Sequence, residues 1–215
     1  MFSVKGNVKS TLLCGPEECS KSFMFEAAIY WAGEGRRVVY ITPAPLDSLP
    51  AGCHERSNPV PAAFKLMRFM YLENYAALAE RLVELHTFAS LPSVLLIDDF
   101  DNYITDYKAT EMSQDMHIAR TCSIILDTMN SCSRILKTSV YICAWSSLMM
   151  TSFPMTPIYF RNIWTISEED DGKVILLEKS VGAKLGSSDS YKFHKLQDGT
   201  RILKEVLGVA TENKT

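Results

Sequence analysis

The chain has 215 residues, of which 47% are apolar and 22% charged, a composition typical of a folded domain and not of a disordered chain. Its net charge of −3 at pH 7 excludes a generally basic nucleic-acid-binding surface, so any contact with DNA needs a local basic patch or a partner. The six cysteines have no paired spacing, which indicates reduced thiols in an intracellular protein and neither a disulfide framework nor a zinc site.

Apolar runs alternate with helical patterns along the first two thirds of the chain. The runs predict strands at Ser10–Cys14, Arg37–Thr42, Lys65–Tyr71, Ser93–Ile97 and Ser139–Ala144. The helical patterns cover Lys21–Trp31, Asn74–Phe88 and Met116–Leu136. The stretch Pro43–Pro61 is rich in Pro, Ser and Gly and predicts an irregular loop of functional importance. This alternation predicts an α/β fold with a mainly parallel central sheet flanked by helices.

No helical pattern separates the apolar stretches near the C-terminus. Short strands are expected at Asn162–Ser167, Lys173–Lys179 and Tyr191–Leu196, with Arg201–Leu207 as a last strand or a helical turn. Tight Gly/Asp turns between them predict an antiparallel extension of the sheet. We expect one domain over residues 10–210, an N-terminal extension over residues 1–9 without a secretory signal, and a frayed tail over residues 211–215.

One uncharged segment, Thr138–Phe160, is long enough to span a membrane. It is rich in Ser and Thr, and Pro154 and Pro157 lie in its second half. A strand followed by a loop is therefore favoured over a membrane helix.

The octet GPEECSKS matches the phosphate-binding loop G-x-x-x-x-G-K-[ST], except that Ser20 replaces the second glycine. Lys21 is expected to reach the β- and γ-phosphates of ATP, and the Ser22 hydroxyl to bind Mg²⁺. The cofactor-binding residues expected from the octet are Gly15, Pro16, Glu17, Glu18, Cys19, Ser20, Lys21 and Ser22. Because Ser20 adds a Cβ and the two glutamates add negative charge, a plain strand–turn–helix junction stays an alternative.

A second motif strengthens the case for nucleotide binding. Val94–Ile97 is an apolar strand that ends in Asp98, the arrangement that carries a carboxylate to the hydration shell of Mg²⁺. Lys21 and Asp98 are therefore candidate catalytic residues and Ser22 and Asp98 candidate metal ligands. Asp99 is a weaker candidate for the general base, because adjacent residues of a strand point to opposite faces.

With these motifs in place, the chain resembles the RecA-type ATPase core of the recombinase paralogs. It is most similar to the SWIM-domain-associated ATPases of the animal Shu complex. The resemblance is carried by Leu12–Gly15, Ala32–Gly35, Val38–Thr42, Pro45–Pro50, Lys65–Phe69 and Ser93–Phe100. It implies binding of ATP and single-stranded DNA, a heterodimer with a SWIM zinc-finger protein, support of a recombinase filament in homologous recombination repair, and a nuclear location.

Two departures from that family concern hydrolysis. The family places a glutamate after the second core strand to orient water, whereas Tyr40–Ala44 has no carboxylate. It places an Asn or Gln sensor after the strand that corresponds to Ser139–Ala144, where this chain has Ala144–Ser147. General base catalysis contributes ~10²–10⁴-fold to a rate. We therefore expect a weak, DNA-linked ATPase at most.

The stretch Trp145–Arg161 corresponds to a DNA-facing loop of the family. Its candidates for a DNA or partner surface are Phe153, Tyr159, Phe160 and Arg161. Aromatic rings can stack on bases, and the Met-rich composition suits a protein interface equally well. Two other functions stay open: an active P-loop NTPase or small-molecule kinase, for which Pro43–Pro61 offers only Arg56 as a lid residue, and an interaction module with a decayed nucleotide site.

Overall fold

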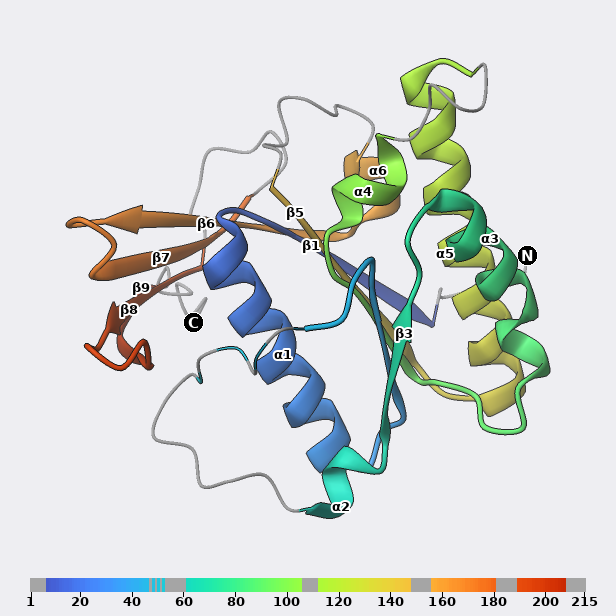
Figure 1. The fold of residues 1–215 in the computed structure, drawn as a ribbon, viewed down its shortest axis with the longest axis horizontal. Coiled ribbons are helices and arrows are strands. Elements are labelled where there is room, and N and C mark those ends of the chain that lie inside the picture. Colours follow the sequence, from blue (N-terminus) through green and yellow to red (C-terminus); the bar gives the residue numbers. More distant parts are fainter. Residues whose placement is uncertain are drawn as a thin grey trace, which may run out of the picture.

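A single sheet runs through the computed structural model, which describes residues 7–46, 48, 50, 52, 61–105, 112–147, 156–180 and 189–207 (Figure 1). Its strands are β1 (Val8–Cys14), β2 (Val38–Thr42), β3 (Met67–Tyr71), β4 (Val94–Ile97), β5 (Val140–Ser146), β6 (Asn162–Glu169), β7 (Val174–Lys179), β8 (Ser190–Lys195) and β9 (Arg201–Leu207). The strand order is β3-β2-β4-β5-β1-β6-β7-β8-β9. Neighbours from β3 to β6 are parallel and those from β6 to β9 antiparallel, as the sequence predicts.

The helices begin and end at residues that explain their bounds. In the described part of the chain they are α1 (Glu17–Gly33), α2 (Pro61–Phe64), α3 (Tyr75–Glu84), α4 (Phe100–Ile104), α5 (Gln114–Leu136), α6 (Thr156–Tyr159) and the 3₁₀ turn η1 (Leu85–Thr87). The Asn74 side chain caps α3 by accepting from the Ala77 N–H at 3.0 Å, and Ser113 caps α5. The short helices α2, α4 and α6 were not expected, because four or five residues show no hydrophobic period.

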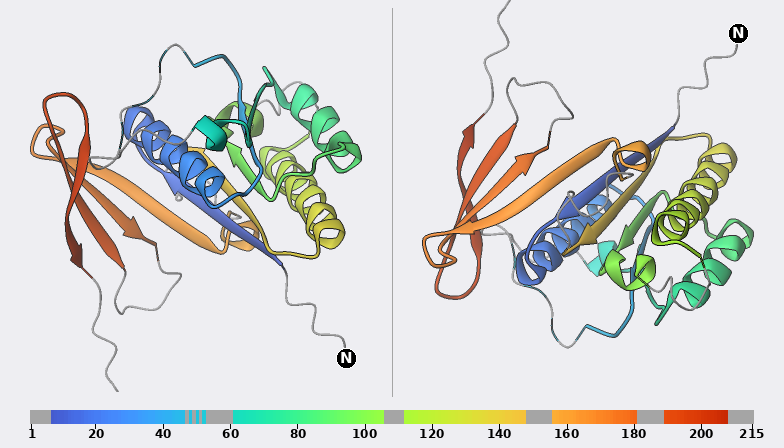
Figure 2. Two further views of the ribbon diagram at one scale, coloured as in Figure 1. Left: turned by 90° about the horizontal axis from the view of Figure 1, so that it is seen from below. Right: turned by 90° about the horizontal axis from the view of Figure 1, so that it is seen from above.

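Two apolar cores lie on the two faces of the sheet. Helix α1 covers one face, and α3, α4 and α5 cover the other (Figure 2). Alternate residues of a strand therefore enter different cores: Leu12, Ile41 and Ile97 pack in the core of α3 and α5. Leu13 and Leu96 pack in the core of α1.

The antiparallel strands stand apart from α3 and α5, at the other end of the sheet (Figure 2). They join the core of α1 through Ile166, Ile175 and Phe193, and the ring centroids of Phe23 and Phe193 are 5.0 Å apart. The first half of α1 is consequently flanked by β6, β8 and β9, which decides the chemistry of its first turn.

Two sequence interpretations have a definite outcome at this level. Arg201–Leu207 is strand β9 and not a helical turn. The described part of Thr138–Phe160 contains β5 and α6, and no helix among the described residues is long and apolar enough to cross a membrane.

Candidate functional site

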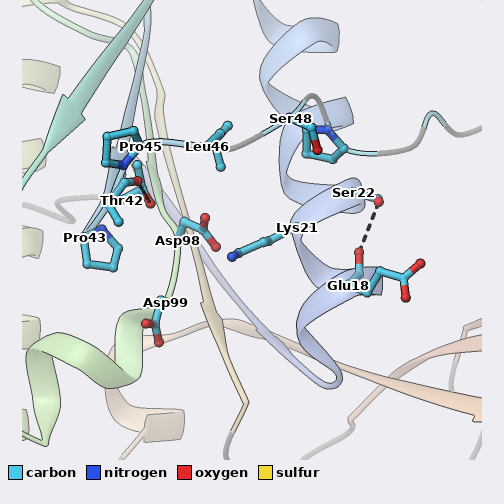
Figure 3. Close-up of a pocket in the computed structure, with 12 residues that line it drawn as sticks. Glu18, Lys21, Ser22, Thr42, Pro43, Pro45, Leu46, Ser48, Asp98 and Asp99 are labelled. Atoms are coloured by element: carbon cyan, nitrogen blue, oxygen red, sulfur yellow. Dashed lines mark hydrogen bonds between the residues drawn. The ribbon is translucent and has the colours of Figure 1, made fainter.

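A pocket of about 480 Å³ lies at the carboxyl edge of the parallel strands (Figure 3). Strands β2 and β4 are neighbours in the sheet, so the residues that follow them lie close together at this edge. The first turns of α1 line the same pocket. The lining residues are Glu18, Lys21, Ser22, Thr42, Pro43, Ala44, Pro45, Leu46, Ser48, Pro50, Asp98 and Asp99. The topology thus brings together the two motifs that the sequence singled out.

Asp98 is a fully buried carboxylate in the wall of this pocket. The Asp98 N–H donates to the Ile41 carbonyl at 2.8 Å, which fixes the residue at the end of β4. Neither carboxylate oxygen of Asp98 makes a hydrogen bond of normal geometry with the described residues. The Tyr40 hydroxyl and the Asp99 N–H nevertheless lie near enough to lower the pKa of Asp98. The Lys21 side chain points toward Asp98 (Figure 3). Burial raises the pKa of Asp98 to about 6, against the opposing charge of Lys21.

Asp99 also lines the pocket, which corrects the expectation that adjacent carboxylates point to opposite faces. Strand β4 ends at Ile97, and Asp99 adopts the left-handed conformation with φ 51° before α4 begins. Asp tolerates this conformation better than most residues. Burial, and then the charge of Asp101, raise the pKa of Asp99.

The octet does not form the open loop that its match to the phosphate-binding motif predicts, and the helix expected from Lys21 begins earlier. Helix α1 begins at Glu17, after the N-cap residue Pro16, and the Ser20 N–H donates to the Pro16 carbonyl at 3.0 Å. Of the expected cofactor-binding residues, Glu18, Lys21 and Ser22 line the pocket. The others, Gly15, Pro16, Glu17, Cys19 and Ser20, do not.

Local chemistry explains why this segment is helical. Ser20 lacks the conformational freedom of the glycine that a phosphate loop has at this position. Glu17 and Glu18 lie in the first turn, where negative charge is favoured by the helix dipole. Lys21 donates to Glu17 at 2.5 Å, one turn apart. Burial lowers the pKa of Lys21, but Glu17, Asp98 and Asp99 together hold it above its usual value.

Gly15 has a packing role at the start of this helix. A Cβ on Gly15 would lie 2.6 Å from the Ile166 Cβ and 2.8 Å from the Ile166 carbonyl oxygen. The glycine therefore permits β1 to turn into α1 against β6, independently of any phosphate.

Arg201 is the residue of this site that sequence reasoning missed. It is fully buried at the start of β9, and its Nη1 donates to the Ser22 Oγ at 2.6 Å. The Ser22 hydroxyl in turn donates to the Glu18 carbonyl at 3.1 Å. The Arg201 N–H donates to the Gly52 carbonyl at 3.1 Å, in the chain stretch that lines the pocket at Ser48 and Pro50. One residue thus connects the expected Mg²⁺ ligand to the outer wall of the pocket.

Two further contacts join the first turn of α1 to the antiparallel strands. Cys19 donates to Glu168 at 2.9 Å, and Lys195 donates to Glu18 at 2.7 Å. The hydrogen bond from Lys195 holds the pKa of Glu18 below its usual value. Burial and then the bond to Glu168 raise the pKa of the Cys19 thiol to about 11, so it is no thiolate at pH 7.

The expected DNA or partner surface is only partly exposed. Phe160 is 4% exposed and packs edge-on against Phe100 in the core, so its assignment to a surface is wrong. Tyr159 is half-buried, and its carbonyl accepts from Ser10 at 2.9 Å. Arg161 is exposed, and Phe153 lies outside the described residues.

The end of β5 donates hydrogen bonds to a carboxylate of α4. Asp101 accepts from the Ser147 N–H at 2.7 Å and from the Ser147 hydroxyl at 2.6 Å. The Ser146 hydroxyl donates to the same carboxylate. Asp101 therefore fixes the end of β5 beside α4, in contrast to Asp98, whose oxygens accept no hydrogen bond of normal geometry from the described residues.

The side chains of the pocket fit a Mg²⁺–nucleotide better than its backbone does. Asp98 offers two buried oxygens without a hydrogen bond to the described protein, and a hydrated cation would satisfy both. Lys21 is the cation that faces it. In contrast, the Ser22 hydroxyl is engaged by Arg201, and the helical first turn of α1 leaves no loop to enclose phosphates. A nucleotide would need that turn to open.

The fold is RecA-like. The RadB recombinase superposes with a TM-score of 0.62 at 12% identity, over 92% of this chain and 91% of that protein. A further solved ATPase domain gives 0.60 at 9% identity, over 93% and 85%, and a DnaB-like replicative helicase gives 0.61 at 9%, over 94% and 58%. At such identities the likeness is one of fold alone.

Sequence comparison gives a more particular relative. The mouse protein named ATPase SWSAP1 is 31% identical over 122 residues, which are 54% of this chain and 40% of the mouse protein. The chain thus matches less than half the length of that relative. No protein family model matches the sequence. The expected RecA-like core and the expected resemblance to recombinase-paralog ATPases are both confirmed.

Proposed function

We propose that this chain is a recombinase-paralog-like protein that binds ATP and Mg²⁺ between α1 and the end of β4. The observation that carries the proposal is Asp98, a buried carboxylate that accepts no hydrogen bond of normal geometry from the described residues. It faces Lys21 in a pocket at the carboxyl edge of a RecA-like sheet. In open α/β sheets this edge is the usual place of the ligand. Lys21 would bind phosphate oxygens, and Asp98 and Ser22 would hold the metal ion.

Hydrolysis is slow or absent under this proposal. The pocket wall at and after the end of β2 consists of Thr42, Ser48 and apolar residues, and the Thr42 hydroxyl donates to the Ala44 carbonyl at 2.9 Å. No carboxylate extends from this wall among the described residues. Asp99 is the alternative base, but it follows β4 and not β2, so it lies outside the wall from which the family orients its water.

The cellular role follows from the resemblance and from the name of the mouse relative. We propose a nuclear protein that supports homologous recombination repair as the heterodimeric partner of a SWIM zinc-finger protein. The complex would bind single-stranded DNA and assist a recombinase filament. Ile158, with 70% of its surface exposed, and the nearby Arg161 supply an apolar and a charged group for such an interface.

The nucleotide proposal is tested by calorimetric titration of ATP with Mg²⁺ into the whole chain. Lys21→Ala removes a charge-assisted contact of ~1.5–3 kcal/mol, so affinity should fall about 10- to 150-fold. Lys173→Ala, an exposed lysine of the β6–β7 turn, is the matched control and should bind as the wild type does. Equal binding by wild type and Lys21→Ala, or no binding by either, would contradict the proposal.

A second function, an interaction module with a decayed nucleotide site, is favoured by one observation: the helical first turn of α1 with Arg201 on Ser22. Co-expression with a SWIM-domain protein separates the outcomes. A stable complex formed equally by wild type and by Lys21→Ala, without ATP binding by either, identifies the interaction module. A stable monomer that neither binds ATP nor forms the complex refutes both functions.

A further inference from the structure

The edge of the sheet opposite the pocket, where the parallel strands begin, carries a group of basic side chains. These residues, here called the basic edge, are Lys9, Arg36, Arg37, Lys65, Arg134 and Lys137. All but Arg36 are exposed, and Arg36 is half-buried. None of the six forms an ion pair with a described residue, because the described ion pairs all involve other residues. The nearest acidic residue in sequence to Arg36 and Arg37 is Glu34.

Backbone hydrogen bonds place these segments next to one another. The Val38 N–H donates to the Leu66 carbonyl at 2.9 Å, and the Ser93 N–H donates to the Arg37 carbonyl at 3.0 Å. The Tyr141 N–H continues the row by donating to the Ser93 carbonyl at 2.9 Å. Lys9 is the register partner of Tyr141. The row spans β3, β2, β4, β5 and β1, or about 20 Å at the usual strand spacing.

Aromatic rings lie among these cations. The ring centroids of Trp31 and Tyr141 are 4.3 Å apart, and the Arg36 guanidinium lies 4.8 Å from the Tyr141 ring and 5.3 Å from the Trp31 ring. Lys9 lies 5.3 Å from the Tyr141 ring. Arg36 also donates to the Ser139 carbonyl at 3.2 Å, so its guanidinium is held in place. Tyr30 packs edge-on against Trp31 and leaves 51% of its surface exposed.

We propose that the basic edge binds single-stranded nucleic acid, with phosphates along the cations and a base on the ring of Tyr30. Unpaired cations in a row match a polyanion, and an exposed ring beside them matches an unstacked base. An acidic peptide or an anionic membrane would use the charges but would give the aromatic group no comparable role. The chain's net charge of −3 requires a local patch for such binding, and this is one. The inference rests on the single-stranded DNA binding in the proposed function and places it opposite the nucleotide pocket.

The test measures binding of a fluorescein-labelled oligo(dT) to the whole chain by anisotropy from 50 to 300 mM NaCl. The variant R37Q/K65Q/K137Q removes three exposed cations of the basic edge. Loss of three phosphate contacts should make the negative slope of log K against log salt shallower by about 2. It should weaken binding about 100-fold at 0.1 M salt. The control K173Q/K192Q/K204Q removes the same charge from the antiparallel extension, at the β6–β7 turn, β8 and β9, and should keep the slope and affinity of the wild type.

Tyr30→Ala separates stacking from charge. It should weaken binding about 5- to 150-fold, the range measured for base–aromatic stacking, and leave the salt slope unchanged. Equal losses in the two triple variants, no binding by the wild type at 50 mM salt, or equal binding of inorganic polyphosphate or anionic vesicles would overturn the proposal. Each of these results leaves the Lys21→Ala comparison for ATP intact, so failure here is distinct from failure of the nucleotide site.

Discussion

Replacing Asp98 by Asn should stabilise the free protein while removing its response to Mg²⁺. The pKa of Asp98 is raised from 3.8 to about 6, a difference of about two units, and this net shift already includes the attraction of Lys21. At 1.36 kcal/mol per unit, keeping this carboxylate ionised at pH 7.5 costs about 3 kcal/mol of stability. Asn resembles the neutral acid in size and charge, so the variant should avoid that penalty.

The pH dependence gives the sharper measurement. Between pH 4 and pH 6 the folded wild type binds more protons at Asp98 than the unfolded chain does, so its stability falls as pH rises through this window. The advantage of Asp98→Asn over the wild type should be about 3 kcal/mol at pH 7.5 and about half of that at pH 5. In thermal scans without Mg²⁺, 3 kcal/mol corresponds to a rise in Tm of about 6–12 °C.

Asp101 supplies the matched control, because its carboxylate accepts hydrogen bonds from Ser146 and Ser147. Asp101→Asn should destabilise the protein, because it replaces one accepting carboxylate oxygen by an NH₂ group. That group cannot accept the hydrogen bonds that Ser146 and Ser147 donate. A wild type as stable as Asp98→Asn at pH 7.5, or a difference that does not shrink on acidification, would show that Asp98 is partnered in solution. The reasoning about an unpartnered metal-binding carboxylate would then be wrong.

Three other variants test the surroundings of the pocket. Arg201→Met frees the Ser22 hydroxyl from its guanidinium, so ATP–Mg²⁺ should bind about tenfold more tightly in calorimetry, and unchanged affinity would show that Arg201 does not compete for Ser22. Steady-state ATP hydrolysis should lie far below the ~10 s⁻¹ of typical enzymes, and a rate near that value that is lost in Asp99→Asn would identify a base that we have rejected. Gly15→Ala should lower the free energy of unfolding in urea by about 1–3 kcal/mol, because its Cβ would overlap Ile166; a wild-type midpoint would mean that β6 moves aside without loss.

The fold could be predicted from local patterns because strand burial and helix period are themselves local. Val94–Ile97 is fully buried as its four apolar residues predict, and the carboxylate that ends it lies where a parallel strand must deliver it. Asp98 was therefore found from the sequence. Asp99 was misplaced because a single left-handed residue changes the direction of the chain, and a strand pattern does not encode that change.

The phosphate-loop motif misled for a different reason. A motif match compares residue types at fixed spacing and leaves out local helix propensity, which Glu17, Glu18 and the Glu17–Lys21 pair raise. Arg201 could not be predicted at all, since its contact with Ser22 joins residues 179 positions apart and depends on how the antiparallel strands turn back over α1.

That long-range contact changes the physical role of the antiparallel extension. Strands β6, β8 and β9 each contribute one side chain to the first two turns of α1: Glu168 to Cys19, Lys195 to Glu18 and Arg201 to Ser22. A nucleotide that opens these turns must weaken these contacts, so the position of the extension and the occupancy of the pocket are coupled. A partner that binds the extension and draws Arg201 away from Ser22 should therefore raise the affinity for nucleotide. By the same linkage, bound nucleotide should raise the affinity for that partner by the same factor.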